Sequence, residues 1–382
     1  MKVISKEWIK ENLRGDPVIW FVVFALCIFS ILVVYSATGT LAYKLKGGNT
    51  EHYLLKHSFL ILLSILAMWA THRINYRYFA PIARMALWIS VPLLLITYKF
   101  GLNFNEASRT LTIPIINQSF QPSDLAKLAL IVSLARMLAK RQQKIEDIKE
   151  SLIPMLFWCG IVCGLIALTN FSSAVLLFST CMLLLFIGRV PVKYLVILVL
   201  IGALFGSIAF SVGQRGETVS NRISDFMAQK EIPFQAKQSF IAIATGGISG
   251  KGPGQSDQRN FLPNSYDDFI YAIIIEEYGM IGGLIVVMLY LAFLFRGMKT
   301  ASESDKAFGG LLSAGLSIAL VLQAMVNMAV VVGLGPITGM PLPMISMGGT
   351  SLLFTGITFG IVLSVSRNNE SEENFEQELV NS

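Results

Sequence analysis

The stretch VIWFVVFALCIFSILVVYSA, residues 18–37, carries no charged side chain and is apolar almost throughout. A run of about 18 or more such residues is long enough to cross the hydrocarbon core of a membrane as one helix. Nine more predominantly apolar spans, some with a few charged residues, lie near residues 54–71, 80–98, 122–140, 152–169, 172–188, 192–213, 268–297, 307–333 and 346–366. We therefore predict an all-α integral membrane protein with about ten transmembrane helices and a large extracytoplasmic loop between the seventh and eighth helices.

The composition agrees with this fold class. Of the 382 residues, 54% are hydrophobic and 14% are charged, whereas ordinary soluble domains carry about 25% charged residues. A soluble enzyme is therefore excluded. The four cysteines lie inside apolar runs and fit no zinc-site spacing, so we interpret them as small buried apolar side chains. Three scattered histidines argue against a histidine-based metal site.

The distribution of lysine and arginine predicts the orientation in the membrane, because positively charged loops resist export. With the N-terminus inside, the inner segments are rich in basic residues, and the short outer loops hold only Lys44, Lys46, Lys56, Lys99 and Arg109. We therefore predict a multi-pass protein of the cytoplasmic (inner) membrane with both termini cytoplasmic. The net charge of +6 follows from this bias and requires no nucleic acid partner.

The chain divides into three predicted regions. Residues 1–16 form a cytoplasmic N-terminal segment, and residues 17–366 form the membrane domain, with the outer loop at residues 214–267. Residues 367–382 are acidic and poor in apolar side chains, which predicts a disordered cytoplasmic tail. The loops dense in Gly, Pro, Ser, Gln and Arg are all on the outer side, so we expect the chemistry on that face.

The first outer group of polar residues precedes and enters the fourth span. It consists of Arg109, Gln121, Ser123, Asp124 and Lys127. Arg109 suits bidentate binding of a phosphate, and a lysine inside a span usually has a functional partner. The alternative is a local ion pair, because Lys127 lies one helical turn beyond Asp124.

The second group lies in the long outer loop. Its candidate binding residues are Arg222, Gln238, Ser239, Gly246, Gly247, Gly250, Lys251 and Gly252. Glycines at this spacing can turn successive N–H groups toward one phosphate, although a flexible connector would have a similar composition. The spacing does not match a nucleotide-binding P-loop, so we predict no nucleotide cofactor. Residues 235–245 show helical spacing of apolar side chains and are expected to turn back toward the membrane.

The third group stands at the mouth of the eighth span. Asp268, Glu276 and Gly279 recur at helical spacing, so we expect them on one helix face, with Glu277 beside them. Two alternatives remain open. Asp267 or Asp268 could simply cap the helix, and the glutamates could belong to an internal hydrogen-bond network, because a buried carboxylate needs partners.

The fourth group precedes the last span and contains Pro336, Thr338, Ser346, Gly348 and Gly349. Non-helical backbone at membrane depth persists only where protein or water satisfies its polar groups. We therefore expect this segment to line a polar cavity, with a plain outer turn as the alternative.

These four motifs, in this order and on this side, resemble the SEDS family (shape, elongation, division and sporulation) of peptidoglycan glycosyltransferases. The resemblance extends from Tyr35-Ser36-Ala37 to Gly348-Gly349-Thr350-Ser351-Leu352. It implies that the protein polymerises lipid II into a lipid-linked glycan at the outer face of the membrane, with Asp268 as the essential carboxylate. It also implies a class B penicillin-binding protein as the partner transpeptidase, alongside membrane lipids.

Three departures from the family pattern occur. Thr110 replaces the tryptophan that commonly follows the arginine, residues 170–173 lack the usual acidic residue, and Met347 replaces a tyrosine. These departures favour the FtsW-like division branch over the RodA-like elongation branch.

A lipid-linked donor also suits the residues themselves. A polyprenyl tail needs an apolar membrane groove, and a donor that arrives as a pyrophosphate needs no nucleotide. We predict Asp268 as general base in a single displacement with inversion. Arg109, Lys127 and the loop glycines would stabilise the departing pyrophosphate, with a divalent cation (Mg²⁺ or Mn²⁺) as a possible cofactor. The alternatives are a lipid II flippase and a non-catalytic scaffold for a cell-wall synthase.

Small residues in the eighth and ninth spans offer a surface for the partner's helix. Gly282-Gly283, Gly309-Gly310 and Ala314-Gly315 would allow close helix approach. The alternative is that these glycines serve packing within the chain.

Overall fold

The computed structural model describes residues 13–39, 50–100, 102–104, 107–113, 118–142, 148–212, 232–263 and 265–381. Ten of its helices match the predicted spans: α2 (Pro17–Ala37), α4 (Thr50–Arg73), α5 (Phe79–Phe100), α6 (Pro122–Arg141), α7 (Ile153–Thr169), α8 (Phe171–Ile187), α9 (Val192–Val212), α12 (Ile270–Ser302), α13 (Ala307–Val331) and α14 (Thr350–Asn381). Short helical turns lie at η1 (Tyr76–Tyr78), η3 (Ile148–Leu152) and η4 (Gln258–Asn260).

The predicted fold class is confirmed. In the described part of the chain, seven helices are long and apolar enough to cross a membrane, and two shorter apolar helices lie at Phe171–Ile187 and Val192–Leu204. Helix α6 is outside both sets because it carries several charged residues. The total of ten spans therefore stays a prediction.

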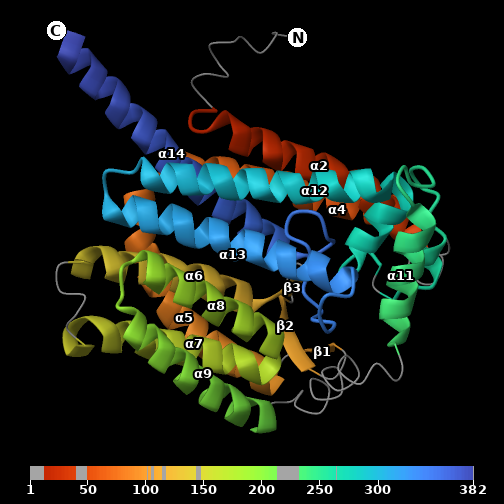
Figure 1. The fold of residues 1–382 in the computed structure, drawn as a ribbon, viewed down its shortest axis with the longest axis horizontal. Coiled ribbons are helices and arrows are strands. Elements are labelled where there is room, and N and C mark those ends of the chain that lie inside the picture. The colour runs from red at the N-terminus through yellow and green to blue at the C-terminus, as the bar shows by residue number, and fades with distance from the viewer. Residues whose placement is uncertain are drawn as a thin grey trace.

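Helix α13 lies at the centre of the bundle, where it packs against α6, α8, α12 and α14 (Figure 1). Helix α14 packs along α4 through Gly356 and Gly360. A Cβ atom on either glycine would collide with the backbone of α4, at Ser64 and at Met68. Two glycines four residues apart on one face therefore set the close approach of these two helices.

Both ends of the described chain lie at the same end of the bundle (Figure 1). The carboxylate of Asp16 pairs with Arg296 of α12, and the backbone N–H of Asp16 donates to Ser366 of α14 at 3.0 Å. Arg367 donates to the carbonyl of Arg73, at the end of α4, at 3.0 Å. These contacts agree with the predicted topology, in which the two termini share one side.

Helix α14 continues to Asn381 and extends beyond its neighbours (Figure 1). The prediction of a disordered tail from residue 367 was therefore wrong for residues 367–381. The helix persists past the membrane domain because residues 364–369 bond to α12, to α4 and to the turn after α4, for example from Asn369 to the Thr300 carbonyl at 3.0 Å.

A small antiparallel sheet between α5 and α6 was not predicted. Its strands are β1 (Leu102–Phe104), β2 (Ala107–Ile113) and β3 (Gln118–Phe120), in the order β1-β2-β3. Leu111 pairs with Phe120, and the Phe120 ring packs against Phe354 with ring centroids 6.2 Å apart. Strands β1 and β3 have three residues each, which is too short for a periodic pattern to reveal.

Helix α12 is broken near its outer end. Gly279 has φ 70° and ψ −175°, which is not helical, so a segment of nine residues precedes the break. Almost all of that first segment is buried. Helix α11 (Phe234–Gly246) packs against α12 and runs across the end of the bundle (Figure 1), which confirms the predicted helix in the outer loop.

Candidate active site

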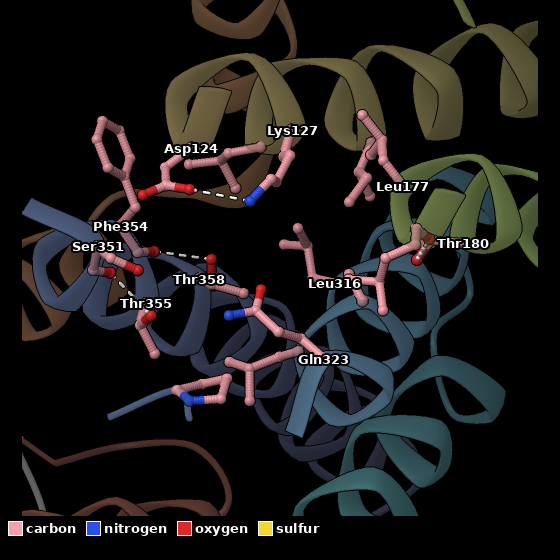
Figure 2. Close-up of a pocket in the computed structure, with 16 residues that line it drawn as sticks. Asp124, Lys127, Leu177, Thr180, Leu316, Gln323, Ser351, Phe354, Thr355 and Thr358 are labelled. Carbon is pink, nitrogen blue, oxygen red and sulfur yellow. Dashed lines mark hydrogen bonds and ion pairs between the residues drawn. The ribbon is translucent and has the colours of Figure 1, made fainter. Parts of the chain in front are cut away.

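A cavity of about 80 Å³ lies between α6, α8, α13 and α14 (Figure 2). Its wall combines leucine side chains with the polar groups of Asp124, Lys127, Gln323, Thr355 and Thr358. Thr358 lies eight residues into α14, about 12 Å along the helix. The threonine hydroxyls bond to carbonyls of their own helices, for example Thr358 to Phe354 at 2.8 Å, whereas Asp124 Oδ2 is buried without a hydrogen-bond partner among the described residues. A buried carboxylate oxygen in an apolar surrounding makes the cavity a candidate binding site.

The ion pair predicted as the local alternative is present at the edge of this cavity. Lys127 Nζ lies 3.0 Å from Asp124 Oδ1, and the two side chains are 17% and 10% exposed. Gln121 donates to Ser123 Oγ at 2.9 Å and to Asp124 Oδ1 at 3.4 Å. Asp124 Oδ2 is buried and has no hydrogen-bond partner among the described residues. The four residues therefore form one polar cluster, from which Asp124 and Lys127 face the cavity.

Asp268 is half-buried in the turn that precedes α12. The three carbonyl groups of this turn are each held from outside it. Met347 N donates to the Tyr266 carbonyl at 3.0 Å, Ser346 Oγ to the Asp267 carbonyl at 2.7 Å, and Asn327 Nδ2 to the Asp268 carbonyl at 2.9 Å. The residue that caps α12 is Phe269, without a side-chain hydrogen bond, so capping by Asp267 or Asp268 was the wrong alternative.

The segment between α13 and α14 is non-helical, as predicted, and its carbonyl groups are satisfied by side chains of surrounding helices. The acceptors are Met340, Pro341, Pro343 and Ile345, and their respective donors are Asn327, Gln323, Tyr290 and Ser30. Met344 is buried with φ 65°, a strained conformation for a residue with a side chain. Many separate bonds thus hold this segment in one shape.

This segment connects the Asp268 turn to the cavity. Pro343 forms part of the cavity wall, which excludes a plain outer turn. Gln323 lines the cavity and Asn327 bonds to Asp268, and these two amides are four residues apart on α13, about 6 Å along the helix. The backbone of Asp268 is therefore tied to α13 about one helical turn from the cavity wall.

The predicted binding residues of the segment between α13 and α14 are buried or half-buried. Ser346 is 1% exposed, donates to Asp267 and accepts from the N–H of Leu342 at 2.8 Å. Ser346 therefore holds the turn and was wrongly predicted as a substrate contact. Thr338, Gly348 and Gly349 are half-buried.

The glycine-rich loop completes the break in α12. Lys251 N and Gly252 N donate to the carbonyls of Glu276 and Glu277, each at 2.9 Å, and Met280 N donates to the Gly247 carbonyl at 2.9 Å. The loop thus replaces the bonds that α12 loses at the break. These contacts remove the N–H groups of Lys251 and Gly252 from the predicted phosphate site.

Close approach of two backbones explains the glycine spacing. A Cβ atom at Gly246 would collide with the Ile275 carbonyl, and one at Gly250 would collide with the backbone of Glu277. Gly279, on the other side of the contact, would collide with Ile248 in the same way. The glycines are therefore required by packing at this contact.

The two glutamates after the turn belong to an internal network, which confirms that alternative. Glu276 is fully buried and accepts from Lys251 Nζ at 2.6 Å and Ser256 Oγ at 2.5 Å, with further bonds from two backbone N–H groups. Glu277 accepts from Ser36 of α2. Neither glutamate lines the cavity, and their role in substrate binding stays a prediction.

A family described as cell cycle protein, which groups FtsW, RodA and SpoVE, matches residues 17–371. The chain belongs to this family. The FtsW/RodA/SpoVE match confirms the resemblance that the sequence motifs indicated.

Relatives of this family cover nearly the whole chain. A probable peptidoglycan glycosyltransferase FtsW from Geobacter metallireducens is 33% identical over 363 residues, which is 94% of this chain and 96% of the relative. Stage V sporulation protein E from Bacillus subtilis is 29% identical and covers 93% of this chain and 98% of its own length. The greater similarity to FtsW proteins agrees with the predicted FtsW-like branch.

Two solved structures share the fold of this FtsW/RodA/SpoVE member. A chain from a structure described as structural coordination of polymerization and crosslinking by a peptidoglycan synthase complex aligns with TM-score 0.73 and 23% identity, over 93% of this chain and 98% of that chain. The rod shape determining protein RodA of Thermus thermophilus aligns with TM-score 0.68 and 22% identity, over 94% and 99%.

Of the remaining predicted binding residues of this family member, Gln238 and Ser239 do not line the cavity. Ser239 is buried and donates to the Val331 carbonyl at 2.8 Å, so its role is structural, and Gln238 is half-buried on α11. Arg109 lies on β2, but its side chain is outside the described part, and Arg222 lies outside the described residues altogether.

The sequence analysis missed Gln323 and Asn327. A signal for them exists, because two amides four residues apart in an apolar span share one helix face. Buried amides in a membrane helix need specific partners, and each of these two bonds to a carbonyl of the segment before α14.

We expect Gly250→Ala to lower the thermal stability of this family member in detergent. Gly250 has φ +80°, and its Cβ would overlap the Glu277 backbone. Gly254→Ala is the matched control, because φ is +75° there and nothing lies within 4 Å of the added Cβ. The left-handed conformation costs about 1–2 kcal/mol at both positions, so only Gly250→Ala adds the overlap. Equal melting temperatures for the two variants would contradict the packing role.

Proposed function

We propose that this chain is a peptidoglycan glycosyltransferase of the division type, which polymerises lipid II into a lipid-linked glycan. The observation that carries the proposal is the placement of the Asp268 turn, tied to α13 about one helical turn from a cavity at membrane depth that contains Lys127. Relatives at 33% and 32% identity carry the name probable peptidoglycan glycosyltransferase FtsW. A lipid-linked sugar needs both an apolar membrane environment and a polar site at the surface.

Asp268 acts as the general base in this proposal. The hydroxyl oxygen of the acceptor sugar attacks the anomeric carbon of the donor sugar, and the bond from that carbon to the pyrophosphate oxygen breaks. The Asp268 carboxylate takes the hydroxyl proton, and the lipid pyrophosphate leaves with the bonding electrons. One displacement inverts the anomeric centre. A positioned base of this kind accelerates a reaction by about 10²–10⁴-fold.

Lys127 and Arg109 stabilise the charge of the pyrophosphate. Lys127 already pairs with Asp124 at 3.0 Å, so in the bound state the ammonium shares its bonds between that carboxylate and a phosphate oxygen. Arg109 lies on β2, between α5 and α6, and its guanidinium suits bidentate binding of a phosphate. The donor is already activated, so no nucleotide is required.

A divalent cation, Mg²⁺ or Mn²⁺, fits the same place as a proposed cofactor. Asp124 Oδ2 is buried without a hydrogen-bond partner among the described residues, and it can serve as one ligand. No cluster of three or more His, Cys, Asp or Glu residues suited to a metal occurs in the described part of the chain. The other ligands would be pyrophosphate oxygens and water, which is usual for Mg²⁺. Such a cation would neutralise charge on the leaving group.

The proposed location is the cytoplasmic (inner) membrane, with both termini in the cytoplasm and Asp268 on the outer face. The excess of basic residues in the inner loops supports this orientation. The contacts of Asp16 with Arg296 and Ser366 support the placement of both termini on one side.

The proposed partner is a class B penicillin-binding protein that supplies the peptide cross-links. The glycines predicted for its docking surface pack within the chain instead: a Cβ at Gly282 would meet Tyr278, and one at Gly315 would meet Ile131 and Leu184. That part of the prediction was wrong, because these glycines face neighbouring side chains of the same protein. The exposed face of α12, with Met280, Leu284 and Phe295, is the surface that remains on these two helices.

The purified protein with labelled lipid II tests the proposed function, with and without the partner. We expect glycan polymer on a gel and inversion of the anomeric centre. Lipid II that crosses vesicle membranes without polymer would indicate a flippase. A polymer that forms only through the partner's own active site would indicate a scaffold.

We expect Lys127→Ala to weaken lipid II binding by about ten- to a hundredfold, because a hydrogen bond to a charged group contributes about 1.5–3 kcal/mol. The variant Asp124→Ala with Lys127→Ala is the control for a purely local ion pair. Titration of labelled lipid II against both proteins in nanodiscs measures the effect. Restored binding and activity in the double variant would show that Lys127 serves only to neutralise Asp124.

A further inference from the structure

Asn327 is a buried amide in the apolar helix α13, and it is 2% exposed. Its side-chain nitrogen Nδ2 donates to the Asp268 carbonyl at 2.9 Å and to the Met340 carbonyl at 2.7 Å. Both contacted atoms are carbonyl oxygens, which can only accept. The nitrogen side of the amide must therefore face them, and the orientation of the side chain is determined by its partners.

A buried amide in a membrane helix is costly unless its bonds compensate for the loss of water. Here both N–H groups of the amide are used, whereas Oδ1 has no hydrogen-bond partner among the described residues. The contribution of Asn327 therefore comes from its two donors. These donors join a turn 59 residues earlier in the chain to a segment 13 residues later.

The two elements that Asn327 joins are also in direct contact. Ser346 Oγ donates to the Asp267 carbonyl at 2.7 Å, and Met347 N donates to the Tyr266 carbonyl at 3.0 Å. The segment before α14 thus holds the first two residues of the turn, and Asn327 holds the third residue and that segment together. Without Asn327, the Asp268 carbonyl would lose its bond to the rigid bundle while the neighbouring residues stayed in place.

We propose that Asn327 is a positioning residue for Asp268. The inference rests on the proposed function, in which Asp268 takes a proton from the acceptor sugar. Gln323, one turn from Asn327 on α13, forms part of the cavity wall. The bond from Asn327 to the Asp268 carbonyl therefore fixes the backbone of Asp268 relative to that wall. A displacement of about 1 Å at a catalytic group can reduce the rate about a hundredfold.

The test compares full-length variants, purified in nanodiscs, by steady-state polymerisation of labelled lipid II. Asn327→Leu has nearly the same shape and no donor, and we expect kcat to fall about a hundredfold while KM and the Kd for lipid II stay within about twofold. Asn327→Gln keeps the donors at a slightly different reach, and we expect part of the rate to return. Thermal melting of each variant reports how much of the loss comes from unfolding.

Ser313→Ala is the matched control. Ser313 is a buried donor on the same helix, and its hydroxyl bonds to the Gly297 carbonyl of α12 at 2.8 Å, far from the Asp268 turn. This variant also loses one buried bond between α13 and α12. We expect it to retain the wild-type kcat.

Three results would overturn the inference. They are an unchanged kcat in folded Asn327→Leu, a loss of lipid II binding in place of kcat, and an equal loss of kcat in Ser313→Ala. If Asn327→Leu does not fold, Asn327→Ala carries the test, because it also lacks both donors, and a wild-type kcat in that variant at reduced melting temperature would mean a purely structural role. Failure of the wild-type protein to make polymer would instead refute the proposed function and, with it, this role.

Discussion

Asp268→Asn should abolish glycan polymerisation while the protein stays folded and inserted in the membrane. The amide has nearly the shape of the carboxylate but cannot take a proton from the acceptor hydroxyl. Loss of a general base lowers the rate by about 10²–10⁴-fold, which brings polymer below detection in a gel assay. The Asn327 bond is made to the Asp268 carbonyl, so the substitution leaves the backbone contact intact.

Asp267→Asn is the control for this result. Asp267 is the preceding residue in the same turn, and its carbonyl bond to Ser346 is likewise independent of the side chain. We expect a much milder effect, because only one carboxylate is assigned as the base. Labelled lipid II on a gel, with thermal melting of both variants, gives the comparison. Polymer close to the wild-type yield in Asp268→Asn would remove this residue as the base.

Glu276→Leu should cause the largest loss of stability among single substitutions in the outer loop network. Glu276 is fully buried, and the leucine would leave Ser256 Oγ and two backbone N–H groups without this acceptor. Lys251 Nζ would lose its bond to Glu276 and keep the one to Asp257 at 2.9 Å. Removal of one partner from a buried ion pair costs about 3–5 kcal/mol. Lys251 is 26% exposed, so we expect the ion pair to contribute the lower part of that range, with the unsatisfied N–H groups adding to it.

Glu276→Gln tests the charge separately from the hydrogen bonds. The amide oxygen can still accept, so we expect a smaller loss of melting temperature than in Glu276→Leu. The ammonium of Lys251 donates to Glu276, which raises the pKa of Lys251 and keeps it charged at neutral pH. A folded Glu276→Leu protein with wild-type melting behaviour would show that the loop is held mainly by its backbone bonds to α12.

The membrane fold could be predicted from local sequence because lipid leaves few choices. A backbone in hydrocarbon must satisfy its own hydrogen bonds, so an apolar run such as residues 18–37 becomes a helix whatever its neighbours are. The same requirement predicted non-helical backbone, held by surrounding protein, in the segment before α14, because its prolines and glycines interrupt a helix. That prediction is confirmed, and Pro343 of this segment forms part of the cavity wall.

The glycine-rich loop shows where local pattern fails. Glycine allows both a phosphate nest and close contact of two backbones, and the sequence around Gly250 is compatible with either. The structure shows that the glycines serve close contact of two backbones. The carbonyl of Glu277, 27 residues after Gly250, accepts from Gly252 N, and the Glu277 backbone leaves no space for a side chain at Gly250. The helical continuation of α14 was missed for a similar reason, because Asn369 bonds to the Thr300 carbonyl, 69 residues earlier in the chain.

The sequence by itself determined that this protein is a helical membrane protein, and the resemblance of its motifs to the SEDS family pointed to Asp268 as the carboxylate to test. It could do so because membrane burial and motif chemistry are properties of neighbouring residues. Only the tertiary structure decided which polar groups serve the site. Asn327 and Ser346 hold the Asp268 turn across 59 and 79 residues, and Glu276 accepts a hydrogen bond from Lys251 of the glycine-rich loop. A buried polar group takes its role from whichever partner folding brings within hydrogen-bond distance, and that partner is not encoded in local spacing.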